Sequence, residues 1–224
     1  MKNNYKWIAH IKKFEKINNI SLGKGWSNSY LNDPKTLLFC LSRYKFVSKM
    51  LAGKKNVFEV GCGESLGSPL VAQSVKKLSC FDITIEDINN NKIRLNKFKN
   101  ITFDIHNFDK KSLKNKFDAA YLLDVLEHIE PKKTKNFLKN IKNSLKKKST
   151  LIIGVPNITA HKYASKNSKK NHINMMNQKT LKNLLSKYFD YNFIFGMNDE
   201  VLHTGYEPMS HYIFIVSSNR KLCW

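Results

Sequence analysis

The sequence predicts an α/β fold with three layers, in which helices cover both faces of a mostly parallel sheet. Two observations carry this prediction. Residues 57–60 form an apolar run typical of a buried parallel strand, and the run opens directly into glycines at 61 and 63. A second apolar run, residues 78–81, ends at Asp82, where the next parallel strand would end. We therefore expect a nucleotide-type cofactor at the carboxyl ends of these strands.

The turn after the first strand has the composition of a ligand-binding loop. Glycine is needed there because a side chain would hold a ligand away from the backbone. Residues 70–75 then supply an apolar helix face. At the end of the second strand, the carboxylate of Asp82 can accept hydrogen bonds from both hydroxyls of a ribose.

The spacing of the glycines separates two classes of cofactor. Dinucleotides require G-x-G-x-x-G, whereas Leu66 occupies the third glycine position here. Glu59 lies two residues before the first glycine and would repel a pyrophosphate. A cofactor without phosphates that carries an ammonium and a sulfonium tolerates such carboxylates, and S-adenosylmethionine fits this description.

On these residues the chain resembles the class I S-adenosylmethionine-dependent methyltransferases, whose first motif has the form E/D-x-G-x-G-x-G. Glu59, Gly61 and Gly63 match that motif, whereas Ser65 stands in place of the third glycine and Gly67 is the residue that would compensate. The resemblance implies a set of cofactor contacts: Glu59, Gly61, Cys62, Gly63, Asp82 with Ile83 at the ribose, Asn107 with Phe108 at the adenine, Asp124 and Arg43.

The later motifs of this family follow in order. Residues 101–108 resemble the third strand and its adenine-contacting turn, and residues 117–125 followed by Leu126-Glu127-His128-Ile129 resemble the fourth strand and its D-x-L-E-H-I ending. Residues 148–156 resemble the fifth strand. The resemblance covers residues 44–157 well and the C-terminal third loosely. It implies a Rossmann-like sandwich with a seven-stranded sheet, an antiparallel last strand and N-terminal helices over the cofactor.

The N-terminal region reads as helical cover. A helix is expected over about residues 5–17, followed by a polar stretch, residues 21–28. Asp33-Pro34 then begins a helix whose apolar face leads into the glycine-loop strand. Aromatic and basic residues of this region either line the acceptor pocket or pack as ordinary core; they are Trp26, Tyr30, Arg43 and Tyr44.

Two segments after the fifth strand are expected to form acceptor loops, because they leave the carboxyl end of the sheet. The first contains His161 and His172 and leads into a helix, residues 180–188. The second, residues 198–209, joins a sixth strand that begins near residue 191 to a last strand, residues 211–216.

The reaction implied by the resemblance is an in-line displacement at the sulfonium methyl, which depends mainly on orientation. A hydroxyl acceptor also needs a base. His128 is the first candidate, because it lies at the exit of the fourth strand; the alternative is a histidine that only orients its neighbours. His172, His203 and His211 are rival bases. No metal is expected: Asp199 and Glu200 are the candidate ligands, but the spacing typical of magnesium-dependent relatives is not evident.

Length and composition predict one domain that needs neither metals nor disulfides. We divide the 224 residues into an N-terminal cover (1–50), a cofactor core (51–157) and a region of acceptor loops and the last two strands (158–224). The four cysteines, at 40, 62, 80 and 223, form no C-x-x-C pair, which favours a reducing cytoplasm. Neither a membrane span nor a secretion signal is evident.

The net charge of +22 has two interpretations. The first interpretation is an RNA partner, because lysines that bind phosphates release counterions and so favour binding to nucleic acid. However, the basic residues include only three arginines, at 43, 94 and 220, and the chain is rich in asparagine and isoleucine. That pattern is typical of an AT-rich genome, and we therefore expect no nucleic-acid partner.

Missing motifs limit the acceptor. The chain has no N-P-P-Y or D-P-P-Y after the fourth strand and no Pro-Cys nucleophile, which disfavours methylation of nucleic-acid bases. We expect a hydroxyl, amine, carboxyl or sulfur on a small molecule, sugar or lipid precursor. An RNA methyltransferase and a non-catalytic binding protein remain as alternatives, and the oligomeric state stays open.

Overall fold

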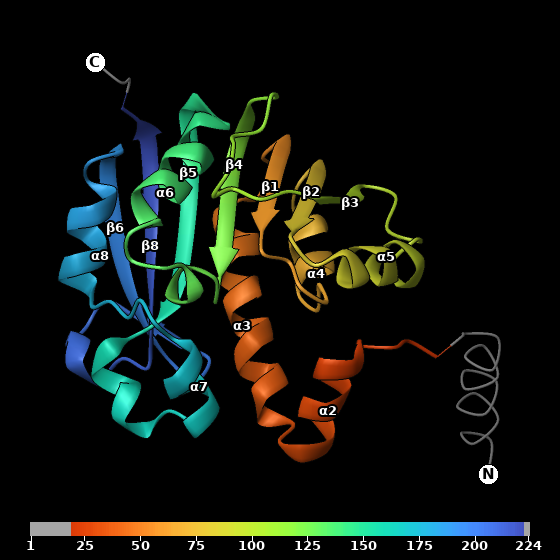
Figure 1. Ribbon diagram of the computed structural model, residues 1–224, viewed down its shortest axis with the longest axis horizontal. Coiled ribbons are helices and arrows are strands. Elements are labelled where there is room, and N and C mark those ends of the chain that lie inside the picture. The colour runs from red at the N-terminus through yellow and green to blue at the C-terminus, as the bar shows by residue number, and fades with distance from the viewer. Residues whose placement is uncertain (1–18, 222–224) are drawn as a thin grey trace, which may run out of the picture.

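A computed structural model describes residues 19–221 (Figure 1). Eight strands form one sheet in the order β3-β2-β1-β4-β5-β8-β6-β7. The strands are β1 (Asn56–Val60), β2 (Lys77–Asp82), β3 (Ile101–Ile105), β4 (Phe117–Leu123), β5 (Leu145–Pro156), β6 (Phe189–Asn198), β7 (Val201–His203) and β8 (Tyr212–Arg220).

The topology confirms the predicted sandwich and its antiparallel last strand. Strands β1 to β5 pair in parallel, whereas β8 runs antiparallel to both β5 and β6. The strand number was underestimated by one. Strand β7 lies within the segment expected to be a loop and pairs antiparallel with the end of β6. The chain reverses there at Asp199, which adopts a positive φ of 51°, so a tight turn replaces part of the long loop.

Helices cover both faces of the sheet. They are α2 (Lys24–Asn32), α3 (Lys35–Met50), α4 (Ser68–Ala72), α5 (Ile85–Arg94), α6 (Thr134–Asn143), α7 (Lys166–Asn171) and α8 (Gln178–Leu185), with short 3₁₀ turns η1 (Leu126–His128), η2 (Ile158–Tyr163) and η3 (Glu207–Met209). One buried cluster joins the sheet to α3, α4 and α5, and a second cluster joins its other face to α6 and α8.

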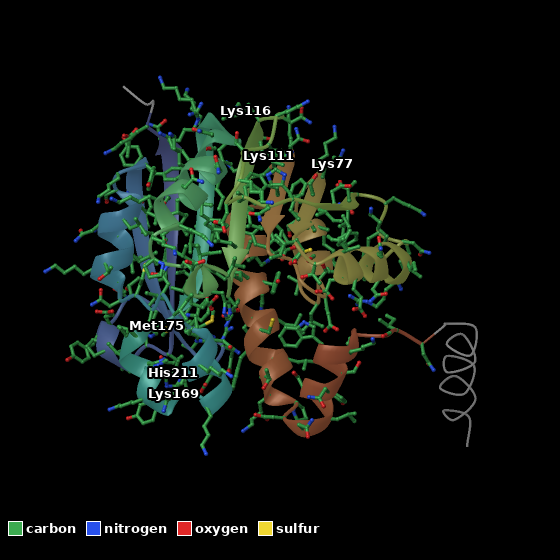
Figure 2. The ribbon with its side chains drawn as sticks, in the orientation of Figure 1. Lys77, Lys111, Lys116, Lys169, Met175 and His211 are labelled. Carbon is green, nitrogen blue, oxygen red and sulfur yellow. The ribbon has the colours of Figure 1, made fainter. Side chains whose placement is uncertain are left out.

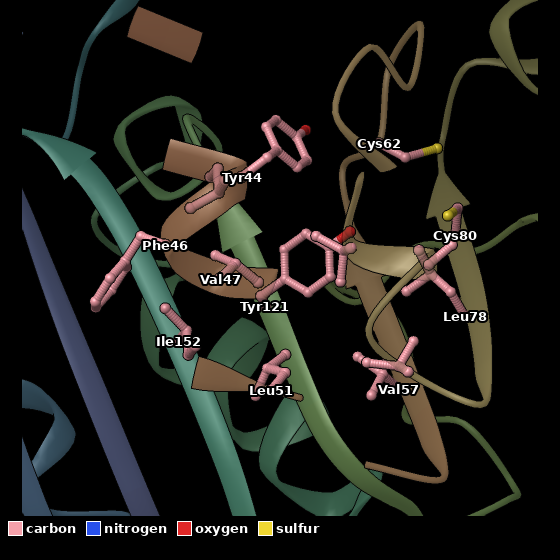
Figure 3. Packing of buried hydrophobic residues seen from close by; sticks show 14 of the residues in the cluster. Tyr44, Phe46, Val47, Leu51, Val57, Cys62, Leu78, Cys80, Tyr121 and Ile152 are labelled. Atoms are coloured by element: carbon pink, nitrogen blue, oxygen red, sulfur yellow. The ribbon is translucent and has the colours of Figure 1, made fainter. Parts of the chain in front are cut away.

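Helix α3 is the main support of the glycine-loop strand. It starts where predicted, with Pro34 at its N-cap position, and it ends shortly before β1. Val47 and Leu51 are fully buried, and Figure 3 shows them facing Val57 and Tyr121 on the central strands. Burying apolar side chains of this size stabilises the fold by roughly 1.5–3 kcal/mol each.

Several element boundaries differ from the prediction. Within residues 101–108, predicted as the third strand and the turn after it, the strand ends at Ile105; the N–H of His106 donates to the carbonyl of Asp82, and the chain then turns. Helix α2 was not predicted, and it begins inside the stretch assigned as polar loop. The helix expected over residues 5–17 lies outside the described residues.

The carboxyl ends of the parallel strands meet at one end of the molecule. In Figure 1 the arrowheads of β1, β2 and β4 point toward the end where α2, the first turns of α3, and α7 lie. Ligands of open α/β sheets bind at this edge. Within residues 19–221, no helix is long and apolar enough to cross a membrane.

Candidate active site

Two glycines shape the turn after β1, and each has a different task. Gly61 has φ +69°, and its N–H donates to the carbonyl of Phe81 at 2.7 Å, which ties the turn to β2. A Cβ at Gly61 would lie 2.5 Å from the side chain of Val125. Gly63 has φ +47° and open space where its Cβ would stand. Glycine at position 61 is therefore needed to make room for Val125, whereas Gly63 leaves the turn accessible to a ligand.

Asp82 is fixed against this turn. One of its carboxylate oxygens accepts from the N–H of Gly63 at 2.8 Å, and the other accepts from the N–H of Thr84 at 2.9 Å. A carboxylate oxygen has two lone pairs, so each retains one acceptor position. Ile83, the next residue, is 67% exposed, and Ile105 at the end of the neighbouring β3 is also exposed. A polar acceptor thus lies beside an apolar surface.

The departure from the glycine motif at Ser65 has a local explanation. Ser65 adopts φ +52°, the left-handed region that favours glycine, although it is buried. Its hydroxyl accepts from the side-chain amide of Asn91 at 3.1 Å, and the same amide donates to the carbonyl of Gly63 at 2.6 Å. Gly67 has a negative φ, and a Cβ there would lie 2.0 Å from the ring of Tyr44. Gly67 therefore answers a packing requirement and does not substitute for the missing glycine.

Three of the expected cofactor contacts have buried side chains. The carboxylate of Glu59 accepts from the hydroxyl of Tyr44 at 2.9 Å and from that of Ser68 at 2.6 Å, which joins α3 to α4 beneath the turn. Burial raises the pKa of the Glu59 carboxyl. The side chains of Cys62 and Phe108 belong to the two core clusters. These residues can therefore contact a ligand only through their main-chain atoms.

Asn107 opens the turn after β3. Its side-chain oxygen accepts from the N–H of Asp109 at 2.8 Å, which is the usual arrangement of an Asx turn. The second lone pair of this oxygen stays available to an amino group. Asn107 thus lies two residues after the exposed Ile105 at the end of β3.

Arg43 and Asp124 form an ion pair at the edge of a cavity. One guanidinium nitrogen of Arg43 lies 3.0 and 2.8 Å from the two carboxylate oxygens of Asp124. The guanidinium also stacks on the ring of Tyr212, 4.0 Å from its centroid. Asp124 has φ +56° and follows β4 directly.

The cavity has a volume of about 950 Å³ and extends from this ion pair to the acceptor loops. Figure 2 shows Met175, His211 and Lys169 in this part of the molecule, around α7. Its walls come from α3, the ends of β4 and β5, η2, α7 and the start of β8; they include Arg43, Asp124, His161, His172, Met175 and His211.

The structure brings together two of the candidate bases. His128 on η1 and His172 after α7 have ring centroids 5.0 Å apart. The Nδ1 of His128 lies 3.1 Å from the carbonyl oxygen of Asn171. Burial, and next to it the neighbouring His128, lowers the pKa of His172. His203 lies on β7 at the edge of the sheet and does not line the cavity, whereas His211 does.

Glu127 was not selected from the sequence. It is fully buried, and neither carboxylate oxygen has a hydrogen-bond partner within the described part of the chain. Burial, and then the charge of Asp124, raises its pKa to about 9. The sequence signal was an acid directly after the apolar Val125-Leu126, where full burial is unusual for a glutamate without a partner. Asp199 and Glu200, the metal ligands that the sequence suggested, lie between β6 and β7 and do not line the cavity, although a carboxylate oxygen of Asp199 lies 3.7 Å from Nδ1 of His211, which does.

Comparison with known proteins identifies relatives of the fold. A family model described as "Methyltransferase domain" matches residues 35–192. No curated protein gave a significant sequence match. The N-methyltransferase NodS from Bradyrhizobium japonicum WM9, solved with S-adenosyl-L-homocysteine, superposes with a TM-score of 0.61 at 15% identity, over 80% of this chain and 85% of that one.

Two further structures have the same architecture. Magnesium protoporphyrin IX methyltransferase from Synechocystis PCC 6803 superposes with a TM-score of 0.62 at 16% identity, over 86% of this chain and 93% of that one. The methyltransferase domain of a bacterial Hen1 superposes with a TM-score of 0.65 at 19% identity, over 80% of this chain and 98% of that one. At these identities the likeness establishes the fold.

Proposed function

This chain belongs to the methyltransferase domain family, and from that premise we propose that it methylates a hydroxyl, amine, carboxyl or sulfur of a small-molecule, sugar or lipid-precursor acceptor. S-adenosylmethionine is the cofactor, and it supplies a methyl group already activated on a sulfonium. The protein's own task is to hold the acceptor in line with that methyl, which can contribute roughly 7–11 kcal/mol to lowering the barrier.

The residues at the glycine turn support this cofactor. The open side of Gly63 admits a ligand to the backbone, and the free lone pairs of Asp82 suit two ribose hydroxyls. The exposed side chains of Ile83 and Ile105 offer an apolar surface for an adenine ring. Arg43 and Asp124 carry the opposite charges that an amino-acid group requires.

The observation that carries the proposed acceptor class is the cavity. Its volume, about 950 Å³, lies within the range of roughly 300–1,000 Å³ typical of small-molecule sites. It begins at the Arg43–Asp124 pair and is lined by short segments of the C-terminal third. An acceptor inside it would be surrounded by both polar and apolar groups, which orient a small molecule.

His128, whose ring centroid lies 5.0 Å from that of the cavity-lining His172, gives the site a route for a proton. When His128 donates from Nδ1 to the carbonyl of Asn171, its Nε2 carries a lone pair that can accept the proton of an acceptor hydroxyl. His172, whose pKa is lowered, favours the neutral state. A base at this position would contribute about 10²–10⁴ in rate.

A lysine-rich surface beside the cavity favours RNA as the second candidate acceptor. Lys162 lines the cavity, and Lys169 and Lys170 end α7 nearby. Bacterial Hen1 and a small RNA methyltransferase have the same architecture. Phosphates would bind such a surface in a salt-dependent manner.

One labelling experiment decides between these acceptors. The protein is incubated with methyl-labelled S-adenosylmethionine and an extract of its source cell, separated into small molecules, RNA and protein. We expect label in the small-molecule fraction, and none there when Asp82→Ala replaces the wild type. Label confined to RNA would overturn the acceptor class, and a protein that binds S-adenosylhomocysteine but labels no fraction would be a non-catalytic binding protein.

A further inference from the structure

Three ligand-type side chains converge at the end of β4. The carboxylate of Glu127 and the imidazoles of His128 and His172 each place a potential ligand atom within 4.8 Å of the others, and they form the one such group among residues 19–221. We propose that Glu127, His128 and His172 bind a divalent transition-metal ion, which takes an oxygen of the acceptor as a further ligand. The coordination of an acceptor oxygen rests on the proposed function, whereas the binding of the ion by these three residues does not.

The strongest support is the isolation of Glu127. Its side chain is completely buried, and both oxygens lack a hydrogen-bond partner within the described chain. Buried polar groups are nearly always paired, and buried carboxylates are usually paired with a cation or bound to a metal. Arg43, the cation whose charge acts on Glu127, already makes a two-point contact with Asp124. A bound metal ion would satisfy the Glu127 carboxylate where no described side chain does.

The tautomer of His128 suits a metal ligand. A backbone carbonyl accepts but cannot donate, so the contact between Nδ1 of His128 and the carbonyl of Asn171 requires a proton on Nδ1. The lone pair then lies on Nε2. Metal-binding histidines commonly donate their other ring N–H to a carbonyl or carboxylate, which fixes both ring and tautomer.

His172 is held against η1 by the backbone of Glu127 itself. The N–H groups of Ile173 and Asn174 both donate to the carbonyl oxygen of Glu127, at 2.9 and 3.0 Å. The segment that carries His172 is therefore tied to the turn that carries the other two ligands. The Nδ1 of His172 is buried without a partner in the described chain, so this ring also has an unsatisfied nitrogen at the cluster.

The donor set indicates which metals would bind. Two imidazole nitrogens and one carboxylate suit Zn²⁺, Fe²⁺, Co²⁺ or Mn²⁺, whereas Mg²⁺ and Ca²⁺ prefer oxygen ligands alone. Three protein ligands leave positions open on the ion. His172 lines the cavity, so these open positions lie where an acceptor would enter.

A metal-bound hydroxyl would make a separate base unnecessary. The ion lowers the pKa of the bound O–H group, and the proton passes to solvent. The oxygen lone pair then forms a bond to the methyl carbon while the carbon–sulfur bond breaks and its electrons stay on the thioether. The Nε2 lone pair of His128 cannot bind the ion and accept a proton at once, so the metal role replaces the base role.

Cobalt binding to untagged, chelator-stripped protein tests the site. We expect one equivalent of Co²⁺ to bind and to give visible d–d absorption. Added Zn²⁺ should compete for the site and remove this absorption. Replacing a ligand, by His172→Ala or by the nearly isosteric Glu127→Gln, should weaken binding by at least about 100-fold, because even changes to outer-shell partners cost 10- to 100-fold. His106→Ala, at a histidine outside the cluster, should bind Co²⁺ as the wild type does.

Binding of S-adenosylhomocysteine, measured on the same samples, separates this proposal from the proposed function. Its retention in the variants shows that they are folded. If the wild type takes up neither Co²⁺ nor Zn²⁺, or if uptake is the same without His128 and His172, the metal site is wrong even where the cofactor binds. If Co²⁺ binds and the cofactor does not, the proposed function fails and the metal site stands.

Discussion

Arg43 and Asp124 meet in a two-point ion pair between residues 81 positions apart in the sequence, with one guanidinium nitrogen 2.8 and 3.0 Å from the two carboxylate oxygens. Their side chains are only 25% and 35% exposed. The pair joins the cover helix α3 to the end of β4, and both residues line the cavity. Asp124 adopts a positive φ of 56° at that point, and the pair fixes its carboxylate there.

A double-mutant cycle measures this pair. We expect Arg43→Gln and Asp124→Asn to show a coupling energy of roughly 0.5–3 kcal/mol in urea unfolding, the range of residues in direct contact. Lys24 and Glu86, a fully surface pair 3.2 Å apart, serve as the control and should couple by less than about 1 kcal/mol. Equal coupling in the two cycles would show that Arg43 and Asp124 contribute no more than surface charges.

Asp82 is expected to govern cofactor affinity. Asp82→Ala would remove the proposed acceptor of two ribose hydroxyls. Hydrogen bonds to a charged group contribute roughly 1.5–3 kcal/mol, so we expect the affinity for S-adenosylhomocysteine to fall by about 10- to 150-fold. The measurement is isothermal titration. Asp104→Ala, at an exposed acid on β3, is the matched control and should leave affinity unchanged. Undiminished binding by Asp82→Ala would refute the ribose assignment.

The cofactor half of the site was predictable from sequence because its residues are local to strand ends. The N–H of Gly63 donates to the Asp82 carboxylate, and the N–H of Gly61 donates to the carbonyl of Phe81, so these three proposed cofactor residues lie together. Each lies within a few residues of an apolar run, and parallel pairing brings such ends to one edge. Ser65 shows the limit of motif matching, since a serine held by Asn91 adopts the glycine conformation.

The acceptor half was only partly predictable, because it depends on contacts between distant segments. The approach of His172 to His128 rests on two hydrogen bonds to the carbonyl of Glu127, and no local pattern reports them. Likewise, the placement of His203 on an extra edge strand follows from a turn at Asp199. The burial of Glu127 also depends on how these segments pack together. Such features require the folded chain.

The buried carboxyl of Glu59 should make stability depend on pH. Its pKa is raised in the folded protein above the unfolded value of about 4.3, so the folded state holds the proton more tightly. Stability from this group is therefore fully present below the unfolded pKa and is lost as pH rises through the folded pKa. We expect the Glu59→Gln variant, which cannot ionise, to gain stability relative to the wild type between pH 4 and neutral pH, as measured by urea unfolding. A constant difference across this range would contradict the assignment.

Glu64 of the glycine turn should control the order of α2. Its two carboxylate oxygens accept from the N–H groups of Gly25 and Trp26, both at 2.9 Å, and thus cap a helix whose own N-cap residue, Gly23, has no side chain. Charge-assisted capping contributes about 0.5–2 kcal/mol.

Glu64→Ala should consequently speed hydrogen exchange in α2 by roughly 2- to 30-fold, since local opening of the helix then costs less free energy. Exchange in α6, on the opposite face of the sheet, should stay as in the wild type. The control is Glu86→Ala, which removes only the exposed contact with Lys24 and should leave α2 protected.

A cofactor bound at the glycine turn should also affect α2, because Glu64 directly follows Gly63 and contacts the start of the helix. We expect the cofactor to slow exchange in α2 of the wild type, and this slowing should be absent from Glu64→Ala. If α2 exchanges at one rate in all three proteins, with and without S-adenosylhomocysteine, the helix is not coupled to the cofactor turn.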